Sequence, residues 1–402
     1  MNNTWKKNNL EEKVFCPLPW YSLTGQENGK IGVCCMNSFV FWWEELWNIQ
    51  TEKMSTLWNS SKIRELRRNM LSWRKSEYCK KCYIKEDSGV ISMRQKYLSY
   101  LKKYIPWYIE NTHDDGVYRG PIKKIDLRLS NLCNLACRMC SGTSSTERIP
   151  LDAKLGISAT RQYTQEPYDT LNFWEDIENW KEVSELKFAW GEPLINPVLF
   201  RILSLAVERW ISKNTTLTLL TNLTVIPEEI KSLIEKFSFI NFQISIDGYG
   251  KSYEYIRIGA RWQKLKENLE ILLLLREKTK KVSIVFMPTV QRDNIYDFPK
   301  LYLFAKKNNI DIDVKPLIFP HFLSIQNIEE NEKQNIIKLY QTCITKYSSS
   351  YEEIKKDFTI ILSFMCKEKA QYQYMSEYRE KTKIMDDFAD TFTYTPSIYE
   401  KV

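Results

Sequence analysis

The sequence predicts an α/β protein built on a partial (β/α)6 TIM-like barrel, and two observations support this fold class. First, residues 124–319 alternate short segments of strand-like periodicity with longer segments whose apolar residues recur at helical spacing. Strands that alternate with helices pair in parallel through right-handed crossovers. Second, six such units are visible, which is fewer than the eight that close a complete barrel.

Each element follows from a local pattern. The first strand, KIDLRLS, alternates apolar and polar side chains, and the helix after the second strand begins at Pro197, because proline suits the first turn of a helix. The expected strands are residues 124–130, 184–190, 215–221, 240–247, 281–290 and 310–319. The expected helices are residues 197–210, 227–237, 262–280, 294–307 and 328–346.

The chain divides into three predicted regions. Residues 1–120 are rich in cysteine and form a small N-terminal module, residues 121–346 form the barrel, and residues 347–402 form a helical C-terminal extension. Between the first two strands, residues 141–182 are longer than a simple connection needs, which indicates an insertion over one face of the barrel.

Composition and charge bound the function. The chain has 402 residues and a formal net charge of +8, but its charges are scattered and mixed in sign, so they favour a polyanionic partner only weakly. The densest basic stretch, residues 62–75, is expected to be a solvated helix face rather than a nucleic-acid contact. No apolar signal core opens the sequence, and the longest apolar run is too short to span a bilayer, so we expect a cytoplasmic protein with no membrane partner.

Three cysteines follow the first predicted strand directly, in the segment LCNLACRMC. Cys133, Cys137 and Cys140 therefore lie at the carboxyl end of a barrel strand, where the chemistry of such folds is found. Three thiolates can hold three irons of a 4Fe–4S cluster and leave the fourth iron open for a small molecule. Zinc is the competing metal, but a structural zinc site needs four ligands.

The cysteine loop and three later segments resemble the radical S-adenosylmethionine (radical SAM) superfamily. The later segments are FAWGEPLINP after the second strand, LLTNLT after the third, and QISIDGYGKSYEYIRIGARW after the fourth. The resemblance covers roughly residues 124–319 and implies a partial (β/α)6 barrel. It also implies a cluster whose open iron binds SAM and whose electron cleaves SAM to a 5′-deoxyadenosyl radical, which then abstracts hydrogen from a substrate.

The resemblance also assigns residues to this cofactor. It implies that Cys133, Cys137 and Cys140 ligate the cluster and that Arg257 pairs with the SAM carboxylate. The remaining residues that it places around SAM are Met139 along the adenine, Gly191 and Glu192 at the amino group, and Asn222 and Ser245 near the ribose and carboxylate. Two positions depart from the family pattern, since Met139 stands where an aromatic residue is usual and Trp190 replaces a glycine.

The N-terminal cysteines resemble the auxiliary-cluster modules called twitch or SPASM domains, here placed before the barrel. The implied ligands are Cys16, Cys34, Cys79 and Cys82, and Cys35 is an alternative to Cys34. The resemblance implies a second iron–sulfur cluster, although the same four thiolates would also suit zinc. The spacing from the turn at Gly29 favours Cys34.

Two functions from different classes are compatible with these features. The first is a radical SAM enzyme that acts on an unknown substrate, with a peptide favoured and a small molecule or nucleotide as alternatives, and that takes electrons from a donor such as flavodoxin or ferredoxin. The second is a non-catalytic binding protein, with nucleic acid as a candidate partner, that zinc or iron–sulfur clusters stabilise. No residue is assigned as a catalytic acid or base toward the substrate.

Overall fold

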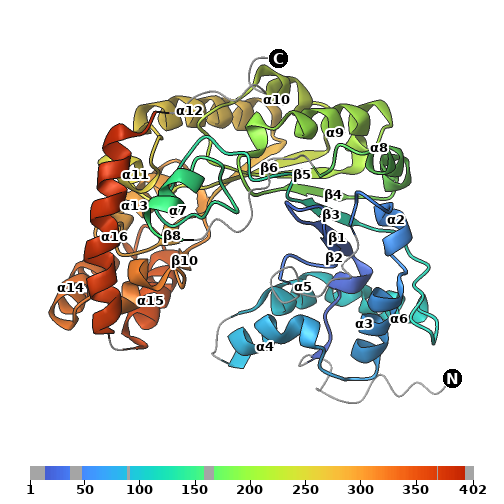
Figure 1. Cartoon of the computed structure of the whole chain (residues 1–402), viewed down its shortest axis with the longest axis horizontal. Coiled ribbons are helices and arrows are strands. Elements are labelled where there is room, and N and C mark those ends of the chain that lie inside the picture. The colour runs from blue at the N-terminus through green and yellow to red at the C-terminus, as the bar shows by residue number, and fades with distance from the viewer. Residues whose placement is uncertain (1–13, 37–47, 88–90, 158–166, 369, 394–402) are drawn as a thin grey trace.

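A central sheet organises the computed structural model, which describes residues 14–36, 48–87, 91–157, 167–368 and 370–393. The sheet has eight strands in the order β2-β1-β3-β4-β5-β6-β7-β9 (Figure 1). The six from β3 to β9 are all parallel and correspond to the six expected strands. The chain therefore has the α/β fold with the partial barrel sheet that the sequence predicts.

The strands are shorter than predicted, and two of them are split. The strands of the central sheet are β1 (Ser22–Gly25), β2 (Ile31–Gly32), β3 (Lys124–Leu127), β4 (Glu185–Phe188), β5 (Thr216–Thr221), β6 (Phe239–Ile244), β7 (Val282–Phe286) and β9 (Asp311–Ile312). A separate parallel pair is formed by β8 (Thr289–Val290) and β10 (Lys315–Pro316). The fifth predicted strand is interrupted at Pro288, whose missing N–H cannot join a ladder.

Helices cover one face of the sheet and extend below its two ends. The helices of the N-terminal part are α2 (Met54–Leu57), α3 (Ser61–Leu71), α4 (Lys80–Asp87), α5 (Met93–Leu101) and α6 (Ile105–Glu110). Those of the barrel are α7 (Ile149–Lys154), α8 (Leu171–Asp176), α9 (Pro197–Glu208), α10 (Glu228–Leu233), α11 (Lys251–Ile256), α12 (Trp262–Thr279) and α13 (Phe298–Lys307). The C-terminal helices are α14 (Glu330–Tyr347), α15 (Glu353–Cys366) and α16 (Tyr372–Thr391).

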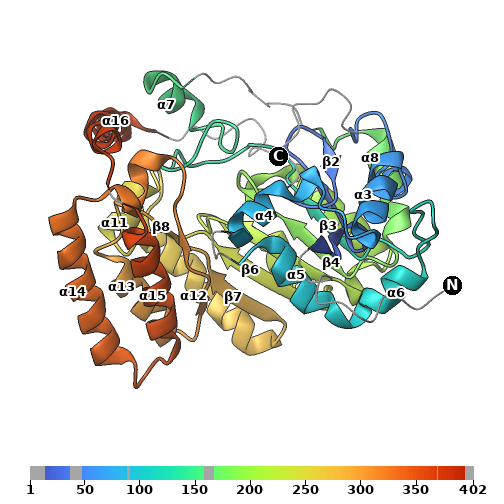
Figure 2. The same cartoon turned by 90° about the horizontal axis from the view of Figure 1, so that it is seen from below.

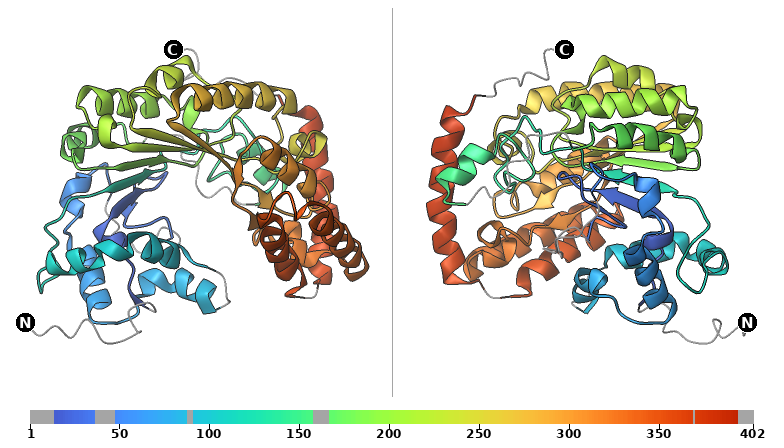
Figure 3. Two further views of the ribbon diagram at one scale, coloured as in Figure 1. Left: turned by 180° about the vertical axis from the view of Figure 1, so that it is seen from behind. Right: turned by 45° about the vertical axis from the view of Figure 1, so that its right-hand side comes forward.

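The overall shape is an arch. Helices α9, α10 and α12 lie on the convex side of the sheet, while α3–α6 and α14–α16 hang from its opposite ends on the other side (Figures 1 and 3). The view from below shows the sheet between these two groups of helices (Figure 2). Among the helices that the structure describes, none has the length and apolar character that crossing a bilayer requires.

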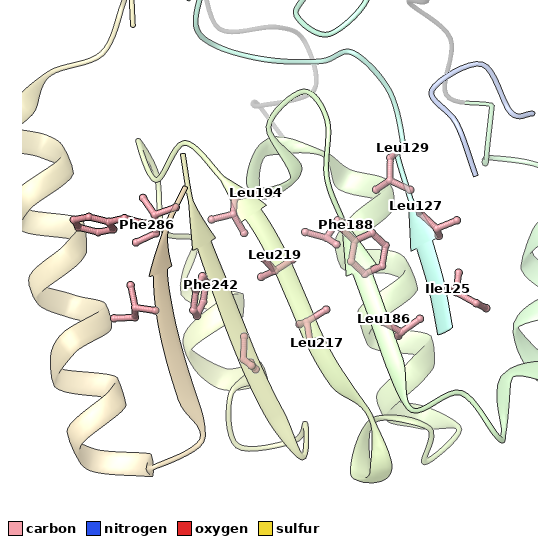
Figure 4. Packing of buried hydrophobic residues seen from close by; sticks show 14 of the residues in the cluster. Ile125, Leu127, Leu129, Leu186, Phe188, Leu194, Leu217, Leu219, Phe242 and Phe286 are labelled. Carbon is pink, nitrogen blue, oxygen red and sulfur yellow. The ribbon is translucent and has the colours of Figure 1, made fainter. Parts of the chain in front are cut away.

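The two faces of the sheet differ in chemistry. Apolar side chains such as Ile125, Leu186 and Leu217 are fully buried on the face that the convex-side helices cover (Figure 4). Burying each such side chain contributes about 1.5–3 kcal/mol to folding. The opposite face carries a row of polar residues that are direct cross-strand partners, and we call it the polar face. This row consists of Thr24, Asp126, Lys187, Thr218, Asn241 and Ser283.

The N-terminal part adds two strands to the barrel sheet, which the sequence pattern does not predict. Strand β1 pairs in parallel with β3, with Ser22 opposite Lys124, and β2 pairs antiparallel with β1. Apolar residues of both parts, such as Trp20 and Ile125, belong to one continuous hydrophobic core. The barrel sheet and the start of the cysteine-rich region are therefore a single packed unit.

The expectation of a solvated basic helix at residues 62–75 is wrong for Arg67. The segment does form α3, but the Arg67 side chain is completely buried. Its guanidinium donates hydrogen bonds to the carbonyl oxygens of Pro19 (2.9 Å) and Trp58 (2.9 Å) and to Asn59 Oδ1 (2.7 Å). A buried cation is tolerated only when its donors are satisfied in this way.

We expect Arg67→Ala to lower the free energy of unfolding by about 3 kcal/mol, because three buried acceptors lose their donor and a cavity remains. The neighbouring Arg68→Ala is the matched control, since Arg68 is exposed on the same helix, and it should change stability by less than about 0.5 kcal/mol. Urea denaturation followed by circular dichroism measures both. Equal stability of the two variants would show that the Arg67 contacts contribute nothing.

Candidate functional site

The loop that carries the three clustered cysteines follows β3 and has no regular secondary structure. Cys133 and Cys137 are buried, and Cys140 is partly exposed. Burial raises the pKa of all three thiols, that of Cys137 to about 12, and the charges of Cys137 and Cys140 raise the pKa of Cys133 further. The three thiols are thus close enough to interact, and a positively charged partner such as a metal cluster would favour their thiolate forms.

Hydrogen bonds from other segments fix the backbone of this loop. The carbonyl of Leu135 accepts from Ser145 Oγ (2.6 Å), and the carbonyl of Cys133 accepts from Thr146 Oγ1 (3.0 Å). On its other side, the amide of Ala136 donates to the carbonyl of Ile258 (3.0 Å). The cysteines are therefore held by the beginning of the 141–182 insertion and by the segment after α11.

Two buried arginines complete this support, and the sequence analysis missed both. Arg148 donates to the carbonyls of Cys137 (2.8 Å) and Arg138 (3.0 Å) and pairs with Asp152 (2.8 Å), whose other oxygen accepts from Gly142 N (2.6 Å). Arg138 pairs with Asp386 of α16, which attaches the C-terminal helix to the loop. The one available signal was the Arg148–Asp152 spacing of four residues, which places both side chains on one helical face.

Glu192 is buried at the carboxyl end of β4 and binds the end of β5. Its carboxylate accepts hydrogen bonds from Thr221 Oγ1 (2.6 Å), Asn222 N (2.6 Å) and Leu194 N (3.0 Å). Burial outweighs these bonds and raises the pKa of Glu192 to about 7. A carboxylate has about four acceptor positions, so one remains for a ligand ammonium group.

Asn222 and Gly191 bring this corner against the cysteine loop. Asn222 Nδ2 lies 4.0 Å from Cys133 Sγ and donates to Asn134 Oδ1 (2.9 Å). Gly191 has a φ of +57°, and a Cβ there would lie 2.3 Å from the Leu132 carbonyl oxygen. A side chain at position 191 would therefore displace the cysteine loop.

Arg257 reaches the loop from the segment after β6. Its guanidinium is buried, pairs with Asp247 at 2.7 Å, and has Nη1 3.9 Å from Cys137 Sγ. Burial alone would lower the pKa of Arg257, but the charge of Asp247 raises it overall, so the arginine stays cationic. The sequence analysis does not assign Asp247 a role, whereas the structure shows that it positions Arg257.

The remaining two residues of the predicted SAM site lie at the same end of the barrel. Ser245 directly follows β6, is half-buried, and donates its backbone N–H to the Thr221 carbonyl (2.8 Å). Met139 is partly buried within the cysteine loop and packs against both hydrophobic clusters of the core. The structure thus brings the three cysteines and all six predicted SAM residues to the carboxyl ends of β3–β6.

The four N-terminal cysteines of the predicted auxiliary site also act on one another. Burial raises the pKa of Cys16, and the charges of Cys79 and Cys82 raise it further. Burial likewise raises the pKa of Cys34, and the charges of Cys35, Cys16 and Cys79, in that order, raise it further. Cys16, Cys34, Cys79 and Cys82 therefore form one group, although they come from distant parts of the sequence.

Cys35 points to a different environment from Cys34. Burial raises its pKa first, and the side chains that then act on it are those of Asp126, Arg128, Lys187 and Lys124 on the polar face. This arrangement favours Cys34 over Cys35 as the fourth member of the auxiliary group.

The donor set of both groups fits iron–sulfur clusters, because each consists of buried or partly buried thiols that influence one another electrostatically. Across residues 14–393, apart from the gaps in the description, no three His, Cys, Asp or Glu side chains gather as ligands of a single metal ion. Ligands of a cubane cluster bind separate iron atoms, so that result concerns a single-ion site.

Comparison with protein families matches both regions. The description "Radical SAM superfamily" matches residues 127–305, and "Iron-sulfur cluster-binding domain", the SPASM family, matches residues 16–83. The chain therefore contains a radical SAM domain, and an iron–sulfur cluster-binding module of the SPASM family precedes it. The cofactors of these domains are SAM with its 4Fe–4S cluster and an auxiliary iron–sulfur cluster.

Solved structures similar to this chain are distant. Streptococcus suis SuiB bound to S-adenosylmethionine is 15% identical, with 67% of this chain and 59% of that chain covered and a TM-score of 0.35. Native anSMEcpe with bound AdoMet is 18% identical, with 59% and 62% covered and a TM-score of 0.39. The chain thus spans about three fifths of the length of these structures. A search of curated proteins finds no match.

The Cys34 assignment predicts a difference between adjacent cysteines. After anaerobic reconstitution, Cys34→Ala should hold about four fewer irons per chain than the parent protein, because one cubane loses a ligand. Cys35→Ala is the matched control and should keep the parent iron content. Iron and sulfide analysis with electron paramagnetic resonance measures both variants. Loss of iron in Cys35→Ala but not in Cys34→Ala would show that Cys35 is the ligand.

Glu192 predicts a pH-dependent stability of the cluster-free protein. Its pKa rises from 4.5 to about 7 on folding, so the folded state binds the proton more tightly and stability falls as pH rises between these values. From pH 5 to pH 8, the parent should lose about 2–3 kcal/mol relative to Glu192→Gln, which cannot ionise. Urea denaturation at the two pH values tests this, and parallel pH profiles would contradict it.

Proposed function

We propose that this protein is a radical SAM enzyme that reductively cleaves SAM at the cluster of Cys133, Cys137 and Cys140. When bound, the 4Fe–4S cluster supplies the electron that breaks SAM into methionine and a 5′-deoxyadenosyl radical, which abstracts hydrogen from a substrate. The observation that carries this proposal is the meeting of three clustered thiols, two of them buried, with Glu192, Asn222 and Arg257 at one end of the barrel.

The residues around the thiols would orient SAM. Glu192 has one acceptor position left for the SAM ammonium, and Gly191 offers backbone beside it. Arg257, kept cationic by Asp247, would pair with the SAM carboxylate. Asn222 and Ser245 would contact the ribose and carboxylate, and the backbone at Met139 would lie along the adenine.

Asn222 and Arg257 would also act on the cluster itself. Their N–H groups lie 4.0 Å and 3.9 Å from Cys133 Sγ and Cys137 Sγ. Donors beside cluster sulfurs stabilise the added negative charge of the reduced state and shift its potential. These two side chains would therefore couple SAM binding to the redox properties of the cluster.

The N-terminal group of Cys16, Cys34, Cys79 and Cys82 would hold the auxiliary cluster. Four protein ligands leave no open iron, so we propose electron transfer or shaping of the substrate site as its role. We further propose a peptide as the substrate, with a small molecule or nucleotide as the alternative, and flavodoxin or ferredoxin as the electron donor. The region boundaries at residues 120 and 346 stay a prediction.

The proposal predicts SAM cleavage by the reconstituted protein. With dithionite as reductant and without added substrate, the protein should release 5′-deoxyadenosine and methionine in equal amounts, measured by liquid chromatography with mass spectrometry. Cys137→Ala should reduce the product at least about a hundredfold, because the cluster loses one of its three ligands.

Cys343→Ala is the matched control, since Cys343 lies on α14 outside both cysteine groups. It should retain the parent rate of SAM cleavage. The proposed function would be contradicted if the parent protein released no 5′-deoxyadenosine. It would also be contradicted if Cys137→Ala released as much 5′-deoxyadenosine as the parent.

A further inference from the structure

The polar face carries charged side chains that the proposed SAM chemistry does not use. Asp126 lies on β3 directly opposite Lys187 of β4. Arg128 is two residues beyond Asp126, so it lies on the same face and nearer the cysteine loop. These three side chains sit between the SAM residues and the N-terminal module.

Asp126 is a buried carboxylate with an unused acceptor. Its side chain is 8% exposed, and its Oδ1 has no hydrogen-bond partner among the residues that the structure describes. Lys187 is half-buried and makes no ion pair with its cross-strand neighbour within the described part of the chain. A buried oxygen without a donor is costly unless a ligand supplies one.

Arg128 is held rigidly and also has an unused group. It donates from Nη1 to Gln26, which directly follows β1, and its guanidinium lies 4.6 Å from the centre of the Trp190 ring. Its Nε is buried and has no partner within the described ranges. A cation–π contact and a side-chain hydrogen bond thus fix the guanidinium while one donor stays open.

Trp190 connects this group to the SAM site. It replaces the glycine of the family pattern, has a φ of +77°, and donates from its indole to the Thr143 carbonyl (3.0 Å). A bulky residue in the left-handed region is strained, so surrounding contacts must hold it there. The departure at this position therefore has a structural consequence, which is the placement of Arg128.

Charge counting shows which ligand suits this place. Lys124 is neutralised by Glu185 at 2.9 Å, and Lys315 of β10 is neutralised by Asp313 at 3.0 Å. The cations of Arg128 and Lys187 then outnumber the anion of Asp126, and Lys96 adds a further positive charge near Lys315. An anionic ligand would reduce this excess of positive charge.

The pKa of Lys315 agrees with this excess of positive charge. Burial lowers it first, and the cations of Lys96 and Lys187 lower it further, despite the Asp313 carboxylate. On the other side of the group, Arg128 donates a hydrogen bond to Gln26, which lies between Cys16 and Cys34 in the sequence. The group thus occupies the region between the two cysteine sites.

We propose that Arg128 and Lys187 bind a carboxylate of the substrate while Asp126 accepts a hydrogen bond from an adjacent amide N–H. This defines an acidic peptide segment as the substrate class, and the inference rests on the proposed radical SAM function. Arg128 and Lys187 are binding residues that determine specificity, and Trp190 and Gln26 are positioning residues.

The test measures binding to the reconstituted protein with three small probes, using saturation-transfer NMR and calorimetric titration. The probes are the N-acetyl, N′-methylamide derivatives of glutamate, glutamine and lysine, which share one backbone and differ in charge. The glutamate derivative should bind at least tenfold more tightly than the other two. Arg128→Gln should weaken its binding at least tenfold, and Arg128→Lys should restore part of the loss.

Lys187→Gln is a second variant that tests the same site if Arg128→Gln does not fold, because Lys187 is half-buried and should tolerate change. It should weaken glutamate binding at least threefold. Arg68→Gln, on the outer face of α3, is the control and should bind as the parent does. Any other pattern overturns the inference, including equal affinity for the glutamine derivative or no binding of the glutamate derivative.

The SAM cleavage assay separates this failure from failure of the proposed function. If the parent releases 5′-deoxyadenosine without any peptide but does not prefer the glutamate derivative, the acidic subsite is wrong and the enzyme assignment stands. If the parent releases no 5′-deoxyadenosine, the proposed function fails first.

Discussion

The structure depends on holding an irregular, buried loop in one conformation. The loop after β3 carries Cys133, Cys137 and Cys140 but makes few hydrogen bonds within itself, so its backbone polar groups need partners from elsewhere. Ser145, Thr146 and Arg148 supply them from the insertion. Three thiols can share one cluster only if this loop does not move, and that rigidity comes from side chains that ligate nothing.

A second set of contacts joins the loop to neighbouring strands. Glu192 ties the end of β4 to the end of β5, and Asn222 and Arg257 extend from β5 and from the segment after β6 to the sulfurs. The Glu192 contacts join neighbouring strands, whereas Asn222 and Arg257 reach back to the loop after β3. The parallel sheet therefore places the carboxyl ends of four strands next to one another, so residues that are far apart in the sequence become neighbours in space.

The sequence predicts the order of the strands well, because period-two alternation in segments such as Thr216–Thr221 reports one buried and one polar face. The grouping of Cys16 with Cys79 follows from the resemblance of the N-terminal cysteines to auxiliary-cluster modules. The sequence does not predict Arg67, Arg138 or Arg148 as buried residues. The sequence alone does not distinguish an arginine whose N–H groups bind water from one whose N–H groups bind protein carbonyls. The sequence analysis also misses β1, because a four-residue strand carries too little pattern to predict the strand or its pairing partner.

The pairing of β1 with β3 has a consequence for biosynthesis. Gln26, next to β1, meets Arg128 across a separation of 102 residues, so this sheet edge cannot form until the ribosome has made β3. Cys16 and Cys34 are synthesised before β3, so they emerge from the ribosome before the first strand of the barrel is available. Strands β1 and β2 lie between these two cysteines in the sequence, so this segment gains its partner in the barrel sheet only after β3 has been synthesised.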